Sequence, residues 1–169
     1  FVTVPPKAWV DSQKDYKEQL NRQFEQVFSN SLEIGCNTEV SLNSAGQVLT
    51  MLATGGKVRS LERNFAEEGE AVRNDFANEL CALALTMRFD EGFPNFSSSN
   101  EKLKNLVVSR GAFKDWSVAE VFNEANTVLG GCTSSYSAFQ MSEVLVEINR
   151  NFLGGEVNNG FLLCPQSGI

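Results

Sequence analysis

Hydrophobic residues recur every three or four positions along most of this chain. This spacing places them on one face of an α-helix. The first such run predicts a helix from residue 11 to residue 32, after an extended arm over residues 1–10 that Trp9 anchors to the body. A second helix is predicted over residues 39–54, where a pair of glycines ends it.

The strongest stripe of apolar residues extends from Val58 to Met87 and predicts a long central helix. Gly69 interrupts this stripe. Because glycine destabilises a helix interior by about 1 kcal/mol relative to alanine, Gly69 marks either a kink or the boundary between two helices.

Three further helices are predicted in the second half of the chain. A short one ends at Gly111. The next covers residues 118–129, and Ser117 and Glu120 form a capping box at its start. The last helix runs from residue 135 to residue 153.

Runs that alternate between apolar and polar residues, as strands do, do not reach a useful length between these segments. We therefore predict an all-α fold, a bundle of five or six helices stabilised by disulfides. The length of 169 residues fits a single domain over residues 1–169, in which residues 156–169 form a tail packed on the bundle.

Composition narrows the function classes. The chain contains no histidine, the commonest catalytic base and the commonest metal ligand, and it lacks a phosphate-binding loop and a GxSxG motif. We therefore predict no catalytic residues, no metal, no cofactor and no enzyme activity. The net charge of −7 argues against nucleic acid as a partner, because phosphate binding requires clustered Lys and Arg. The longest uncharged apolar stretch is too short to span a bilayer, so no membrane segment is predicted.

The four cysteines are Cys36, Cys81, Cys132 and Cys164. Their spacing matches no zinc pattern, so we predict oxidised pairs. Three connectivities are possible. We favour Cys36 with Cys132, which both lie just outside predicted helices, and Cys81 with Cys164. A buried, unpaired Cys81 is the alternative.

The triplet Asn95-Phe96-Ser97 is a sequon for glycosylation of Asn95. Both this triplet and disulfide bonds are typical of proteins in oxidising compartments. The sequence therefore predicts a secreted, extracellular protein.

Charged residues along the predicted central helix are ordered by sign. Basic residues come first and acidic residues follow, an order that opposes the helix macrodipole and that local helix stability does not explain. Two antiparallel copies would match the basic end of one to the acidic stretch of the other, which predicts a homodimer. An ordinary solvated face is the alternative. The predicted interface residues are Lys57, Arg59, Arg63, Glu67, Glu68, Glu70, Asp75 and Glu79.

The order of several features resembles the N-terminal domain of spider silk proteins (spidroins). These features are Trp9 before a first helix with Phe24 and Phe28, the sequence Asp75-Phe76-Ala77-Asn78-Glu79-Leu80, the sequence Trp116-Ser117-Val118-Ala119-Glu120, and Glu147, Ile148 and Phe152 in the last helix. The resemblance implies a secreted five-helix bundle that dimerises antiparallel as the pH falls, through charge pairing and protonation of acidic residues. It also implies a disulfide between the first and fourth helices, which Cys36 and Cys132 would suit.

The chain departs from that family in three respects. It is longer, with the excess over residues 93–116, and it has two further cysteines. Ala82 and Met87 occupy the positions of the family's pH-sensing glutamates, so that Glu79 or Glu91 would have to replace them.

The sequence thus predicts a secreted, non-enzymatic structural module for self-association, a terminal assembly domain that controls the solubility and dimerisation of a silk-like protein. The alternative is a secreted helical carrier, whose thirteen phenylalanines line a cavity for a lipid or another apolar small molecule. The first hypothesis predicts a homodimer, and the second predicts a monomer that binds an apolar ligand.

Overall fold

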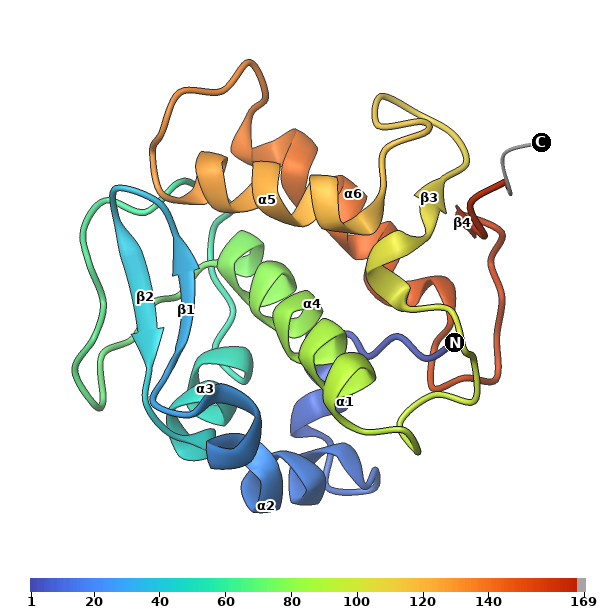
Figure 1. The fold of residues 1–169 in the computed structure, drawn as a ribbon. Coiled ribbons are helices and arrows are strands. Elements are labelled where there is room, and N and C mark those ends of the chain that lie inside the picture. Colours follow the sequence, from blue (N-terminus) through green and yellow to red (C-terminus); the bar gives the residue numbers. More distant parts are fainter. Residues whose placement is uncertain (167–169) are drawn as a thin grey trace.

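One helix, α4, forms the centre of the molecule. The computed structural model describes residues 1–166. In Figure 1 the helices α1, α2 and α3 lie on one side of α4, and α5 and α6 lie on the other. Within these residues the α-helices are α1 (Pro6–Val10), α2 (Tyr16–Phe28), α3 (Ala45–Leu52), α4 (Asp75–Gly92), α5 (Val118–Leu129) and α6 (Ala138–Asn151).

The start of α4 is fixed by Asn74. Its Oδ1 accepts hydrogen bonds from the backbone N–H groups of Phe76 (3.0 Å) and Ala77 (3.2 Å), two of the donors that the first turn of a helix leaves unpaired. Twelve of the eighteen residues in α4 are buried, so the helix is covered on nearly all sides.

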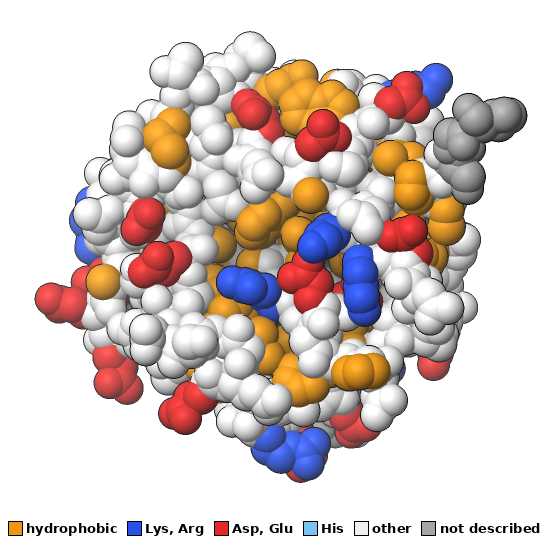
Figure 2. All heavy atoms as spheres, viewed as in Figure 1, with side chains coloured by type: hydrophobic (Ala, Val, Ile, Leu, Met, Phe, Trp, Pro, Cys, Tyr) orange, Lys and Arg blue, Asp and Glu red, His pale blue; other side chains and the backbone are white. Residues whose placement is uncertain are grey.

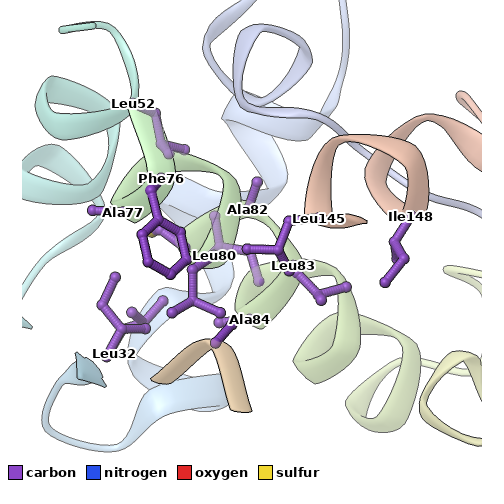
Figure 3. Packing of buried hydrophobic residues seen from close by; sticks show 14 of the residues in the cluster. Leu32, Leu52, Phe76, Ala77, Leu80, Ala82, Leu83, Ala84, Leu145 and Ile148 are labelled. Atoms are coloured by element: carbon purple, nitrogen blue, oxygen red, sulfur yellow. The ribbon is translucent and has the colours of Figure 1, made fainter. Parts of the chain in front are cut away.

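The hydrophobic core is built around α4. Phe76, Leu80 and Leu83 of α4 lie close to Leu52 of α3 and Leu145 of α6 in Figure 3, and all five side chains are buried. Full burial of one such side chain contributes about 1.5–3 kcal/mol. The contacts of α4 therefore account for a large part of the stability of the folded state.

A β-hairpin stands where the sequence pattern predicted the junction of two helices. β1 (Leu32–Gly35) pairs antiparallel with β2 (Glu39–Leu42). Gly35 has a φ of +122°, and a Cβ at this position would lie 2.2 Å from the carbonyl oxygen of Thr38, so the tight turn requires glycine. The buried hairpin residues alternate with the others and are Leu32, Ile34, Val40 and Leu42.

A second sheet pairs β3 (Val107–Val108) with β4 (Leu162–Leu163), again antiparallel. The short helix predicted before Gly111 is reduced to a single 3-10 turn, η1 (Leu103–Asn105). The prediction of an all-α fold is therefore wrong. Across residues 1–166 the architecture is mixed, with six α-helices and two small antiparallel sheets.

Residues 53–74 form an irregular connection instead of the first half of a long helix. Their backbone groups bond to distant segments: Leu61 N–H donates to the carbonyl of Leu129 (2.8 Å), and Phe65 N–H donates to that of Glu39 (2.9 Å). The apolar residues here are spaced as in a helix but are buried by separate neighbours. Gly69 lies in a turn with a φ of +84°, so it is neither a kink nor a boundary between helices.

The N-terminal arm is extended only as far as Pro5, because α1 begins at Pro6 and contains the fully buried Trp9. Thr3 forms a parallel bridge with Leu153. Thr3 N–H donates to the carbonyl of Phe152 (2.9 Å), whose own N–H donates to Thr3 Oγ1 (2.8 Å). The arm is thereby fixed to the end of α6.

The capping box predicted for α5 is confirmed. Ser117 Oγ accepts from Glu120 N–H (3.1 Å), and Glu120 Oε2 accepts from Ser117 N–H (2.7 Å).

In the tail predicted over residues 156–169, Phe161 and Leu162 are buried while residues 156–160 are exposed. Residues 167–169 of that tail lie outside the described residues.

Candidate functional site

The eight charged residues predicted to form an interface do not share a helix. Lys57, Arg59, Arg63, Glu67, Glu68 and Glu70 lie in the irregular connection, and only Asp75 and Glu79 lie on α4. The macrodipole argument for antiparallel pairing along a helix therefore loses its basis, because most of these charges are not on one.

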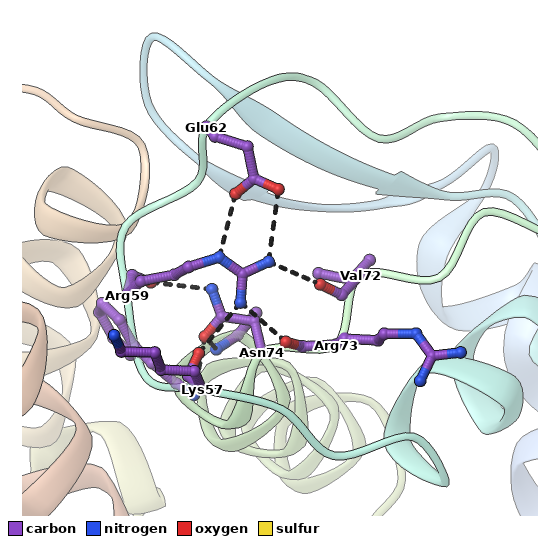
Figure 4. A network of polar contacts seen from close by, with 8 residues as sticks. Lys57, Arg59, Glu62, Val72, Arg73 and Asn74 are labelled. Atoms are coloured by element: carbon purple, nitrogen blue, oxygen red, sulfur yellow. Dashed lines mark hydrogen bonds and ion pairs between the residues drawn. The ribbon is translucent and has the colours of Figure 1, made fainter.

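Arg59 links the two ends of the irregular connection over residues 53–74 by hydrogen bonds. Its guanidinium donates to both carboxylate oxygens of Glu62 (3.2 and 3.3 Å) and to the carbonyl oxygens of Lys57, Val72 and Arg73 (3.1, 3.1 and 2.8 Å) (Figure 4). The hydrogen bonds from Arg59 lower the pKa of Glu62. A guanidinium has five N–H donors in a planar fork. One arginine side chain can therefore bond to several separate segments of the backbone.

Several of the other predicted interface residues also have partners within the same molecule. Arg63 forms an ion pair with Glu70 (3.1 Å) and lies 4.0 Å from the centre of the Phe65 ring. Asp75 Oδ1 accepts from Gly56 N–H (2.9 Å). Within residues 1–166, Lys57, Glu67 and Glu68 have side chains without a hydrogen bond or ion pair. An intermolecular pairing of the eight charged residues stays a prediction, and for Arg59, Arg63 and Glu70 it would have to displace contacts within the molecule.

Glu79 is the predicted interface residue with the most perturbed surroundings. Burial between α4 and α6 raises the pKa of its carboxyl group, against the opposing effects of a hydrogen bond from Asn149 and the charge of Arg150. Asn149 Nδ2 donates to Glu79 Oε2 (2.7 Å) and to the Glu79 carbonyl (2.9 Å). The buried Oδ1 of Asn149 has no hydrogen-bond partner among the described residues.

We expect Glu79→Gln to stabilise the protein relative to wild type at neutral pH, by an amount that grows as the pH rises from the ordinary pKa of 4.5 through the raised folded-state pKa and is then constant. Because the folded-state pKa of Glu79 is raised above its ordinary value of 4.5, the folded state holds this proton more tightly, and the stability that it contributes is lost as the pH rises. Glutamine avoids the buried charge, and its amide can donate to the unpaired Asn149 Oδ1. Thermal unfolding between pH 4 and pH 8 tests this expectation. Glu25→Gln, which removes one charge from an exposed position on α2, is the matched control. A wild-type melting temperature above that of Glu79→Gln at pH 8 would contradict the account.

The disulfide predictions have opposite outcomes. Cys36 and Cys132 are bonded, with their Cα atoms 6.1 Å apart, so this pair is confirmed. The pair of Cys81 with Cys164 is wrong, because Cys81 is fully buried in α4 while Cys164 is exposed. Burial raises the pKa of the Cys81 thiol to about 12. Cys81 is therefore a protonated core residue, which was the alternative, and not a nucleophile.

Asn95 lies in an exposed turn after α4, where a glycosylation enzyme can reach it.

The phenylalanines are mostly core residues. Eight of the thirteen are buried, namely Phe24, Phe28, Phe65, Phe76, Phe89, Phe113, Phe152 and Phe161.

Phe139, in the first turn of α6, is exposed, whereas Phe1, Phe93, Phe96 and Phe122 are partly buried. Its side chain is 63% exposed, the largest exposed fraction among the large hydrophobic residues described. It borders a groove of about 530 Å³, which we call the α6 groove. The apolar lining residues are Val58, Ala112, Phe113, Phe139, Val144, Val146 and Phe161.

The sequence pattern misplaced Phe139 on the buried stripe of the last helix. Phe139 precedes the buried Met141 by two residues, which is a rotation of about 200° around a helix. The buried stripe consists of Met141, Leu145 and Ile148, so a position two residues before Met141 faces away from the core.

Charges of both signs surround the α6 groove. Arg110 lies 5.1 Å from the centre of the Phe161 ring and 3.8 Å from a carboxylate oxygen of Glu147. Glu143 also borders the groove and is exposed. On the face of the molecule shown in Figure 2, acidic side chains are spread from the edge to the centre, where basic side chains adjoin them, and they do not gather at one point. Among the described residues, no group of three or more Cys, Asp and Glu side chains is placed to hold a metal ion.

No protein-family model, curated protein or solved structure matches this chain. In the part of the chain that the structure describes, no helix is both long enough and apolar enough to cross a membrane.

Proposed function

We propose that this protein is a non-enzymatic structural module that self-associates, and that the α6 groove is the surface by which two copies bind. The observation that carries the proposal is Phe139, a large apolar side chain that is mostly in water and lies beside an apolar groove. An exposed apolar patch rimmed by charged residues is typical of a protein–protein interface.

Burial of Phe139 against a partner supplies a favourable free energy. Transfer of a phenylalanine side chain out of water contributes about 1.5–3 kcal/mol, and aromatic residues are common among the residues that dominate binding energy. Phe139 lies in the first turn of a capped helix, so little backbone conformational entropy is lost when it binds.

The charges around the groove favour a second copy as the partner. In a two-fold symmetric dimer the same patch is used twice, so the patch must be complementary to itself. The residues around the α6 groove allow this, because the basic Arg110 and the acidic Glu143 both border its apolar lining. A rotation by 180° can bring Arg110 of each copy to Glu143 of the other.

An extracellular location is part of the proposal. The Cys36–Cys132 disulfide supports it, because disulfides persist in oxidising compartments. The narrower role, as a terminal assembly domain of a silk-like protein, rests on the sequence resemblance alone. The carrier hypothesis has less support, because most of the phenylalanines fill the core.

We expect Phe139→Asp to weaken self-association by about 10- to 100-fold, since it removes the apolar contact and puts a charge in its place. Sedimentation velocity over a range of protein concentrations measures the dimer dissociation constant. Val157→Asp is the matched control, because Val157 is also exposed but does not line the α6 groove.

Two results would count against this proposal. One is a wild-type protein that stays monomeric at every concentration that can be reached, at pH 7.5 and at pH 5.5. The other is a dimer that Phe139→Asp and Val157→Asp weaken equally.

A further inference from the structure

A second hollow, which shares no lining residue with the α6 groove, lies beside the N-terminal arm. It has a volume of about 860 Å³, within the ~300–1,000 Å³ typical of small-molecule sites. Four segments far apart in sequence form its walls, which are the arm with α1, the start of α2, the turn after α4 and the turn after α6. We call it the N-terminal cleft.

Three aromatic side chains line the N-terminal cleft and are supported from behind. Phe96 stacks on the fully buried Trp9, with ring centres 6.5 Å apart and an angle of 7° between the planes. Tyr16 also contacts Trp9 (5.6 Å), and Phe93 contacts the buried Phe89 (5.3 Å). All three lining rings are partly exposed, so they present apolar surfaces whose positions the core fixes.

The polar lining residues carry balanced charges. Lys7, Lys14 and Arg22 are basic, and Asp11, Asp15 and Glu156 are acidic, so the formal charges cancel. The whole chain has a net charge of −7, so the cleft is neutral although the protein is acidic. The cleft therefore offers both hydrogen-bond donors and hydrogen-bond acceptors beside its aromatic surfaces.

The hydroxyl of Tyr16 adds a further group to the cleft. Partial burial and the nearby charges of Glu156 and Asp15 raise the pKa of this phenol, so it remains protonated and able to donate. Within residues 1–166 it has no hydrogen-bond partner.

We propose that the N-terminal cleft binds a neutral oligosaccharide. Each sugar hydroxyl both donates and accepts, so a neighbouring pair can bond to a carboxylate and to an ammonium group at once. The face of a sugar ring presents C–H groups, which pack on an aromatic ring such as Phe96. No residue that lines the α6 groove is involved.

Other ligand classes fit the lining less well. A lipid would leave six charged side chains against apolar surface, at a cost in desolvation. A polyanion would meet as many carboxylates as cations. A proline-rich peptide packs on aromatic grooves, but proline has no N–H, so the peptide would offer few donors to the carboxylates of Asp15 and Glu156.

The test is a titration of the protein with maltotriose, cellotriose and chitotriose, followed by NMR and by calorimetry. Because Asn95 lies on the rim, any glycan there is removed enzymatically beforehand. We expect saturable binding of at least one trisaccharide, with shift changes at Tyr16 and Phe96. Since the ligand is uncharged, its dissociation constant should change less than about twofold between low and high salt.

Two variants and one control locate the binding. Phe96→Ala should weaken it about tenfold by removing the stacking surface, and Asp15→Ala about fivefold by removing an acceptor. Asp15 is exposed and makes no capping hydrogen bond, so this variant should fold even if Phe96→Ala does not. Phe139→Asp should bind as wild type does, which separates this site from the self-association surface.

The proposal is overturned if none of the three trisaccharides shows saturable binding. It is also overturned if Asp15→Ala, shown by circular dichroism to be folded, binds as tightly as wild type. Binding of a proline-rich decapeptide in place of the sugars would assign the N-terminal cleft to peptide recognition instead.

Discussion

Removal of the Cys36–Cys132 disulfide is expected to lower the free energy of unfolding by about 2–5 kcal/mol. The two cysteines are 96 residues apart, so the bond closes a long loop. Without it the unfolded chain gains conformational freedom that the folded state does not. The bond also joins the hairpin turn to the end of α5, where Gly35 N–H donates to Asn126 Oδ1 (2.8 Å).

The double variant Cys36→Ala/Cys132→Ala measures this effect by urea unfolding. Its denaturant slope should also rise, because the unfolded state becomes more expanded. Cys164→Ala is the matched control, since it removes an exposed, unbonded thiol. If the double variant and Cys164→Ala had the same unfolding midpoint as wild type, the bond would have no stabilising role.

Phe76→Ala is expected to destabilise the protein by about 3–5 kcal/mol, since it leaves a cavity at the start of α4. Phe76 is fully buried among core residues that surround α4 (Figure 3). In a chain of this size each kcal/mol lowers the melting temperature by about 2–4 °C. The melting temperature should therefore fall by roughly 6–20 °C.

Phe139→Ala provides the same change of side chain at an exposed position. At a concentration where both proteins are monomeric, it should alter stability by less than about 0.5 kcal/mol. Equal losses in the two variants would show that Phe139 is buried in solution, and would remove the basis for the α6 groove as a free surface.

The sequence predicted the fold best where local signals agreed with tertiary contacts. The predicted bounds of α5 match those observed, because its apolar stripe coincides with a capping box at Ser117. The apolar stripe also predicted the middle of α4. The start of α4 was missed, although Asn74 followed by Asp75 is a typical helix beginning.

The hairpin and the irregular connection could not be predicted in the same way. Each strand contributes only two buried residues, and Leu32 and Val40 also fit the helical spacing of their neighbours. In residues 53–74 the apolar residues follow a helical period, but the backbone bonds to Glu39 and Leu129 that fix them are long-range. Such bonds leave no local pattern in a sequence.

The candidate sites show the same division. Sequence reasoning identified Arg59 and Arg63 as unusual, but it could not show that their partners lie within the same molecule. The N-terminal cleft could not be predicted from the sequence, because its four walls come from segments up to about 150 residues apart. By contrast, Phe139 could have been found from its angular position relative to Met141.

The bridge between Thr3 and Leu153 has a mechanical consequence. The two segments run parallel, so tension between the N-terminal arm and the chain beyond α6 pulls them past each other along their length. The three hydrogen bonds of Thr3 with Phe152 and Gly154 then share the load in shear, and none opens alone. A chain stretched through this protein would therefore strain this bridge and the β3–β4 pairing before it strains α4 and the core.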